Sequence, residues 1–137
     1  MIKLCKNDKE FFNICDKLKG MKIRLTERVL YNYMTAGLFN KKSFTFISYD
    51  EKMNGCLVLL LLKDLFGEET LRMLFTWIDA HYPKLHKEFI DITIEKAREL
   101  GIKKVGFTTN RNEKIIDRRV GKYGFKKVCS LYERKVI

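Results

Sequence analysis

A strand, a tight turn and a long helix are predicted in this order between Glu69 and Gly101, and this unit restricts the fold more than any other stretch. The strand covers about residues 71–78 and the helix about residues 84–100. A turn between a strand and a helix collects free backbone N–H groups and the positive end of the helix dipole, so it suits anionic ligands. The basic residues of this turn are His81, Lys84, His86 and Lys87. The sequence therefore predicts an anion-binding turn, or a crossover turn whose basic side chains are only solvated.

The length and composition of the chain are those of one globular domain. Its 137 residues, 46% of them hydrophobic and 33% charged, are enough for a core without disulfide or metal support. We therefore expect a single domain, residues 1–137. No apolar run approaches membrane-spanning length, and the N-terminal sequence MIKLCKNDKE lacks the apolar core of a signal peptide. We expect a cytoplasmic protein without a membrane partner.

Basic residues outnumber acidic residues, which gives a formal net charge of +11. This charge favours an anionic partner, either a nucleic acid or a phosphate-bearing cofactor. The basic residues are spread along the whole chain and form no basic arm. The charge therefore indicates an anionic partner without choosing between these two classes.

The cysteines and histidines show no metal-binding pattern. The four cysteines are scattered without a C-x-x-C pair, so we expect them to be reduced and structural. His81 and His86 are the only histidines, and their spacing is poor for two ligands on one helix face. Asp79 or Glu88 could add a third ligand, but we expect no metal site.

The remaining periodicity predicts one mixed α/β domain. Apolar residues at helical spacing predict helices at residues 8–19, from Thr26 onward, and at 110–122. Strands are predicted at residues 1–5, 43–49, 55–62, 69–79, 102–109 and 125–136. The run 56–62 is apolar on both faces, which indicates a central strand covered on both sides. A turn at residues 50–55 predicts an antiparallel hairpin, and the long helix predicts a parallel strand pair after it.

Three stretches resemble the Gcn5-related N-acetyltransferase (GNAT) superfamily. They are YDEKMNGCLVLLLL, EKARELGIKKVGFTTN and KYGFKKVCSLYERKV, which extend the resemblance from Ser43 to the C-terminus. The resemblance implies a GNAT-like fold, with a mixed central sheet, a splayed parallel strand pair and about four flanking helices. It also implies that acetyl-CoA binds as co-substrate where the parallel strands separate, with its pyrophosphate at the N-terminus of the central helix.

The cofactor loop departs from the family pattern Gln/Arg-x-x-Gly-x-Gly/Ala. Counted back from Gly101, the Arg position falls on His81 and the two Gly positions fall on Lys84 and His86. Basic side chains would then replace close backbone contacts to phosphate. The cofactor-binding residues that the resemblance implies are Ile78, Asp79, His81, Lys84, Leu85, His86, Lys87 and Asn110.

The catalytic groups are also assigned through the resemblance. The family commonly has a tyrosine acid about four residues before its closing glycine, a place that Val120 or Arg119 occupies here. Tyr123 is the nearest phenol, and Tyr132 is a second choice. Glu69 best matches the family's general base, with Asp79 as an alternative.

The resemblance implies an N-acetyltransferase that moves an acetyl group from acetyl-CoA to an amine by direct attack. An alternative is a GNAT-like fold that has lost catalysis and binds an anionic macromolecule such as RNA or DNA. A third hypothesis is an acetyltransferase whose acceptor sits on a nucleic acid or a ribosomal protein. The sequence leaves the acceptor open and permits a monomer or a homodimer.

Overall fold

The computed structural model describes residues 1–6, 8–18, 32, 42–108, 113–128 and 132–136. The chain divides into two compact units, Met1–Phe107 and Thr108–Ile137. The single domain expected for residues 1–137 stays a prediction. The predicted helix that begins at Thr26 lies outside the described residues.

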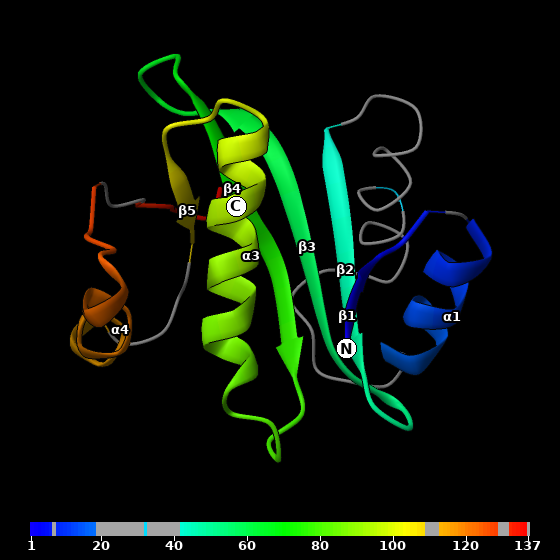
Figure 1. Cartoon of the computed structure of the whole chain (residues 1–137). Coiled ribbons are helices and arrows are strands. Elements are labelled where there is room, and N and C mark those ends of the chain that lie inside the picture. Colours follow the sequence, from blue (N-terminus) through cyan, green and yellow to red (C-terminus); the bar gives the residue numbers. More distant parts are fainter. Residues whose placement is uncertain (7, 19–31, 33–41, 109–112, 129–131, 137) are drawn as a thin grey trace. The chain divides into compact units, whose positions relative to one another are not determined.

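The first unit contains a mixed sheet with the strand order β1-β2-β3-β4-β5 (Figure 1). The strands are β1 (Ile2–Leu4), β2 (Ser43–Tyr49), β3 (Met53–Lys63), β4 (Glu69–Ile78) and β5 (Val105–Phe107). The first four strands pair antiparallel with their neighbours, and β5 pairs parallel with β4. α3 (Leu85–Glu99) connects β4 to β5, as a parallel pair requires. The predicted mixed sheet, antiparallel in its first part and with a parallel pair after α3, is confirmed.

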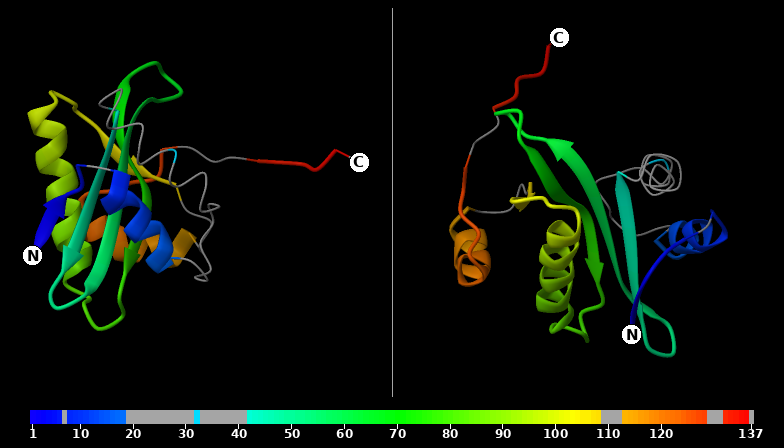
Figure 2. Two further views of the ribbon diagram at one scale, coloured as in Figure 1. Left: turned by 90° about the vertical axis from the view of Figure 1, so that its right-hand side faces the viewer. Right: turned by 45° about the horizontal axis from the view of Figure 1, so that its top comes forward.

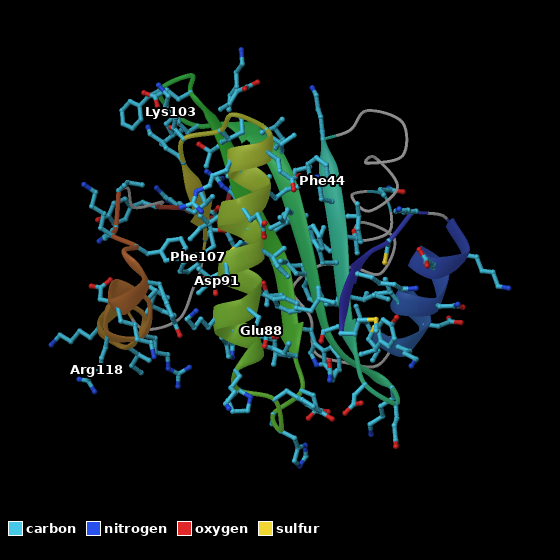
Figure 3. All side chains as sticks on the ribbon, viewed as in Figure 1. Phe44, Glu88, Asp91, Lys103, Phe107 and Arg118 are labelled. Atoms are coloured by element: carbon cyan, nitrogen blue, oxygen red, sulfur yellow. The ribbon has the colours of Figure 1, made fainter. Side chains whose placement is uncertain are left out.

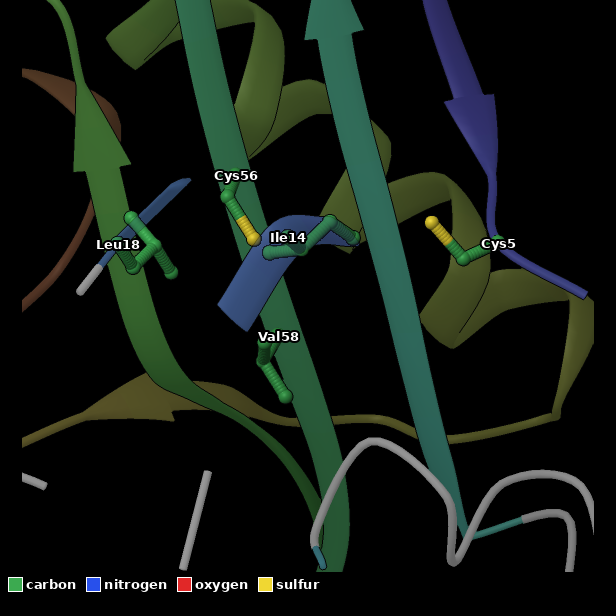
Figure 4. Close-up of a cluster of buried hydrophobic side chains, with 5 residues drawn as sticks. All are labelled: Cys5, Ile14, Leu18, Cys56 and Val58. Atoms are coloured by element: carbon green, nitrogen blue, oxygen red, sulfur yellow. The ribbon is translucent and has the colours of Figure 1, made fainter. Parts of the chain in front are cut away.

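β3 is a central strand whose two faces belong to two cores, one under each helix (Figures 1 and 2). The core under α1 (Asp8–Leu18) consists of Cys5, Ile14, Leu18, Cys56 and Val58 (Figure 4). The core under α3 consists of Leu57, Leu59, Leu71, Phe89 and Ala97. Successive residues of a strand point to opposite faces, so an apolar run suits a strand that is covered twice. The predicted double covering of this strand is confirmed.

The β2–β3 hairpin turns earlier than the sequence predicted. The N–H of Asp50 donates to the carbonyl of Lys52 at 3.1 Å, and β3 begins at Met53. Asn54 and Gly55 are therefore strand residues and not turn residues. Gly55 is needed for packing, because a Cβ there would lie 3.0 Å from Cζ of Phe89. The glycine lets the first turns of α3 lie directly on β3.

The second unit contains one short helix in its described part. α4 (Glu113–Val120) continues into a 3₁₀ turn, Gly121–Tyr123, which ends at Gly124 with φ +86°. This agrees with the predicted helix, residues 110–122, where it is described. The predicted final strand is wrong for residues 125–128 and 132–136, which form no strand. The strand predicted at residues 102–109 is only three residues long, as β5. Within the described residues, no helix is long and apolar enough to cross a membrane.

Candidate functional site

β4 and β5 pair over only part of the length of β4. Their parallel register runs from Leu71 opposite Val105 to Met73 opposite Phe107, whereas β4 continues to Ile78. A β-bulge occurs at the same place, because Leu59 and Val58 of β3 face Met73 and Phe75 and leave Leu74 as an extra residue. A bulge bends its strand and increases the local twist. The bulge therefore coincides with the point at which β4 separates from β5.

Beyond the bulge, β4 has a partner strand on one side only among the described residues of the first unit. Residues 75–78 remain paired with β3, and no described strand of this unit pairs with the other edge of residues 74–78. Five extended residues span about 16 Å. An unpaired strand edge of this kind offers backbone N–H and C=O groups to an extended ligand.

A short turn, organised by Asp79, joins the end of β4 to α3. The N–H of Asp79 donates to the carbonyl of Asn54 at 2.9 Å, which ties the turn to β3. One carboxylate oxygen of Asp79 lies 2.9 Å from the backbone N of His81 and 2.8 Å from its ring Nδ1. Hydrogen bonds from His81 lower the pKa of Asp79; the bond from its backbone N–H has the largest effect, and the bond from its ring the next largest. A carboxylate held in its charged form is a weak base, so Asp79 fits a role in shaping the turn.

The N-terminus of α3 carries no side-chain cap. Lys84 occupies the N-cap position and cannot accept a hydrogen bond from the helix. The N–H groups of Leu85 and His86 donate to carbonyls of the turn, at 3.1 and 3.4 Å. Within residues 42–108, the N–H of Lys84 has no acceptor and its exposed ammonium has no ion pair. This end of α3 thus combines a free donor, a free cation and the positive end of the helix dipole.

Several of the predicted site residues lie together where β4, the turn and α3 meet, a place called the junction below. Some of their side chains are exposed and others are buried or paired. Ile78 ends β4, while His81 and His86 are exposed in the turn and at the start of α3. Leu85 is buried under the helix, so its side chain belongs to the core. The ammonium of Lys87 pairs with Asp91 at 2.8 Å. Acidic residues therefore also occur on this exposed side of α3, as Glu88 and Asp91 show in Figure 3.

The predicted catalytic residues lie away from this junction or cannot be placed beside it. Glu69 is the first residue of β4, exposed and opposite Lys63, about 30 Å along the strand from the turn. Tyr123 is half-buried in the second unit, with the ammonium of Lys122 5.1 Å from its ring centre. Asn110 lies outside the described residues. The roles of these three residues stay predictions.

Arg72 was not singled out from the sequence, although it lies next to the point where β4 and β5 separate. It is half-buried in β4, opposite Leu60 of β3 and Gly106 of β5. Its Nε is buried without a hydrogen-bond partner in the described part of the chain. The sequence signal that could have singled out Arg72 is its position as the one charged residue in the interior of the strand sequence ETLRMLFTWI. Groups of three metal-binding side chains do not occur among the described residues.

Solved structures of acetyltransferases have this architecture. The chain resembles an aminoglycoside 6′-N-acetyltransferase from Acinetobacter haemolyticus, with 12% identity, 100% and 99% of the two chains covered, and a TM-score of 0.76. It also resembles a predicted acetyltransferase with acetyl-CoA from Clostridium acetobutylicum (13%, 98% and 96%, 0.74). A ribosomal-protein-alanine N-acetyltransferase from Brucella melitensis is similar as well (13%, 99% and 99%, 0.70).

At these identities the likeness concerns the fold. No protein-family model and no curated protein sequence matches the chain. The chain has the fold of the GNAT N-acetyltransferases, as the sequence resemblance implied. Its sequence has diverged far from those of the three acetyltransferases, which are 12% or 13% identical to it.

Proposed function

We propose that this protein is an N-acetyltransferase that transfers the acetyl group of acetyl-CoA to an amine. One observation carries the proposal: the edge of β4 with which no described strand pairs leads from the bulge at Leu74 directly to the N-terminus of α3, which has no side-chain cap. This arrangement offers an extended binding edge with an anion site at one end. Acetyl-CoA has the matching chemistry, since its pantetheine arm carries amide groups and ends in a pyrophosphate.

The residues at the junction fit the phosphate end of this co-substrate. Lys84 would contribute its free N–H and its ammonium, and His81, His86 and Lys87 would add further donors. The carboxylate of Asp79 opposes phosphate binding, but His81 donates two hydrogen bonds to it. The pantetheine arm would lie along residues 74–78, which places the thioester near the bulge. Charged side chains would thus replace the close backbone contacts of a glycine-rich loop.

The reaction would be a direct attack of the amine on the thioester carbonyl. The amine nitrogen forms a bond to the acetyl carbon, the carbon–sulfur bond breaks, and CoA leaves as a thiolate. A base removes one proton from the amine and an acid protonates the thiolate. Tyr123 is our proposed acid and Glu69 our proposed base, on the strength of the sequence resemblance. Glu69 lies about 16 Å along β4 from Leu74, so it could accept the proton only through intervening water.

Calorimetry with acetyl-CoA and with CoA tests the proposal. We expect the wild type to bind both, and Lys84→Glu to weaken binding by about tenfold or more because it replaces an attractive charge with a repulsive one. Lys103→Glu is the matched control, since it makes the same charge change in the exposed connection at the other end of α3 (Figure 3). Absence of binding at millimolar acetyl-CoA would refute the proposed function. Equal weakening by both variants would refute the position of the phosphate site.

A second candidate function rests on the net charge of +11. A GNAT-like fold without catalysis could bind RNA, DNA or a ribosomal partner through its basic surface. Such binding would weaken steeply with salt and would not respond to CoA. Filter binding of a generic RNA at several salt concentrations, with and without CoA, distinguishes the two candidates.

A further inference from the structure

The guanidinium of Arg72 has no counter-charge among the described residues, and Arg72 lies on a strand that has a neighbour on each side. β4 has strands on both sides at this position, and Leu60 and Gly106 are the neighbours of Arg72 across the sheet. The buried Nε has no hydrogen-bond partner, and no ion pair to Arg72 occurs among the described residues. A partly buried arginine loses some of its hydration, and this loss is costly without an anion beside it. The half-buried side chain still leaves a ligand access to the guanidinium.

Three hydroxyl groups without partners lie on the same face of the sheet as Arg72. Ser43, Thr45 and Thr70 are at most 6% exposed, and none of their side-chain oxygens has a partner in the described part of the chain. Ser43 and Arg72 both face Leu60, from the two sides of β3, and Thr70 lies two residues before Arg72. Strand spacings put Ser43 about 10 Å and Thr70 about 7 Å from Arg72, and Thr45 lies two residues beyond Ser43 on β2.

Ser43, Thr70 and Arg72 lie at one end of the apolar core under α1, and Thr45, which pairs with Val58 of that core, borders it. That core lies further along the same face, over Cys56 and Val58 (Figure 4). Four of the five buried polar side-chain atoms without a partner belong to Ser43, Thr45, Thr70 and Arg72, so the unsatisfied groups are concentrated on one face. One cation and several hydroxyl donors around one point form a site for an anionic, hydrogen-bonding group.

The site also lies close to the place where the reaction would occur. Arg72 immediately precedes Met73, the last residue of β4 that pairs with β5, and the bulge at Leu74 follows. If the pantetheine arm lies along residues 74–78, the thioester ends beside this bulge. An amine that approaches from the α1 face would then place its other groups next to Arg72.

We propose that Arg72, together with the hydroxyls of Ser43, Thr45 and Thr70, binds a carboxylate of the acceptor. The acceptor class is thus a small amine that also carries a carboxylate, as in an amino acid. The planar guanidinium matches a carboxylate with two parallel hydrogen bonds, and it repels polycationic amines. This assignment rests on the proposed function and names its substrate class.

Matched pairs of amines test the assignment. L-Lysine with cadaverine, and L-phenylalanine with phenethylamine, differ within each pair only by the carboxylate, and kanamycin serves as a polycation. Acetylated products are quantified by mass spectrometry, because free cysteines would disturb a thiol assay. We expect kcat/KM to be about tenfold or more higher for the carboxylated member of a pair, as one charge-assisted contact provides.

Variants then assign the preference to Arg72. Arg72→Gln should bring the ratio of kcat/KM within each pair close to one, and Arg72→Lys should leave an intermediate ratio because it keeps the charge and loses the bidentate geometry. Arg98→Gln is the matched control, since Arg98 is exposed on α3, and its ratio should equal that of the wild type. Circular dichroism reports whether the variants are folded. If Arg72→Gln does not fold, Arg72→Lys still provides the test.

Each outcome distinguishes the proposed function from the carboxylate assignment. Calorimetry with acetyl-CoA reports on the proposed function alone, and its failure would remove that function and this assignment with it. Binding of acetyl-CoA together with a preference for cadaverine, phenethylamine or kanamycin would overturn only the carboxylate assignment. The carboxylate assignment is likewise overturned if no carboxylated amine is acetylated, or if the Arg72 variants keep the ratio of the wild type.

Discussion

The contact between Gly55 and α3 holds the candidate phosphate site in place, and Gly55→Ala tests this contact directly. A Cβ at this position would lie 3.0 and 3.2 Å from two ring carbons of Phe89 and 3.1 Å from Cδ1 of Leu85. Ordinary contacts between carbon atoms are about 3.5–4.0 Å, so the helix or the ring must move by about half an ångström. Gly55 pairs with Ile78 at the end of β4. Any movement of the helix therefore acts next to the turn.

Two opposing contributions set the change in the free energy of unfolding that we expect for Gly55→Ala. Forcing a methyl group into a filled core costs about 1–3 kcal/mol, and Phe89 is fully buried, so its ring has little room. Replacing a glycine also restricts the unfolded chain, which stabilises the protein by about 0.4–1 kcal/mol. The net loss in the free energy of unfolding is therefore about 1–2 kcal/mol. For a chain of 137 residues this corresponds to a fall in Tm of about 5 °C.

Urea unfolding followed by circular dichroism measures this loss. Gly106→Ala is the matched control, because its Cβ would lie 3.9 Å from the nearest atom, a methyl carbon of Thr70, which is an ordinary contact. The double variant with Phe89→Leu makes room for the new methyl group, so we expect the cost of Gly55→Ala to shrink in that background. If Gly55→Ala were as stable as Gly106→Ala, or if its cost were unchanged in the Phe89→Leu background, the packing argument would be wrong.

Two further predictions concern the buried core. Burial raises the pKa of the Cys5 thiol to about 12, while an unfolded cysteine ionises near pH 8.5. The contribution of Cys5 to stability is therefore complete below about pH 8.5 and is lost as the pH rises toward 12. From pH 8.5 to 10 the wild type should lose about 2 kcal/mol more than Cys5→Ala in urea titrations, and parallel pH profiles would contradict this. The hydroxyl of Thr93 donates to the carbonyl of Phe89 at 2.7 Å inside α3, where the helix itself already supplies a donor to that carbonyl. Thr93→Val should therefore lower the free energy of unfolding by less than about 1 kcal/mol. Thr93→Ser should lower it by more, because it removes a buried methyl group, and the reverse order would refute this view.

The parts of the fold that depend on local patterns could be predicted from the sequence. The apolar run in β3 and the amphipathic pattern of α3 each report the burial of their own residues, so their existence and type were clear. The extent of strand pairing is a property of distant segments. Residues 102–109 and 125–136 have strand-like composition, yet only Val105–Phe107 pairs with another strand in the described part of the chain. Composition cannot indicate which hydrogen-bonding partner a strand will find.

The candidate site was predictable to the same extent. The basic turn is contiguous in sequence, so Lys84 and its neighbours could be assigned to one place. Arg72 was missed because one polar residue in a strand usually faces solvent, and the sequence does not reveal that both neighbouring strands continue past it. The bulge at Leu74 was equally hidden, because it arises from the register between β3 and β4. Glu69 was chosen for its position in the sequence, and the strand carries it to the opposite end of the sheet from the turn.

The net charge of +11 acts differently at the two anion sites proposed for this unit. Lys84 is exposed, and at physiological salt its attraction for a phosphate is screened over about 8 Å, so it supports binding and provides little selectivity. Arg72 is half-buried among hydroxyls, where screening is weaker and a misplaced or missing anion leaves an unsatisfied charge. The bulk charge can therefore bring many anions to the protein, but only a group that matches the guanidinium gains from Arg72. On this view the acceptor is selected at β4, and the basic surface mainly raises the local concentration of anionic ligands.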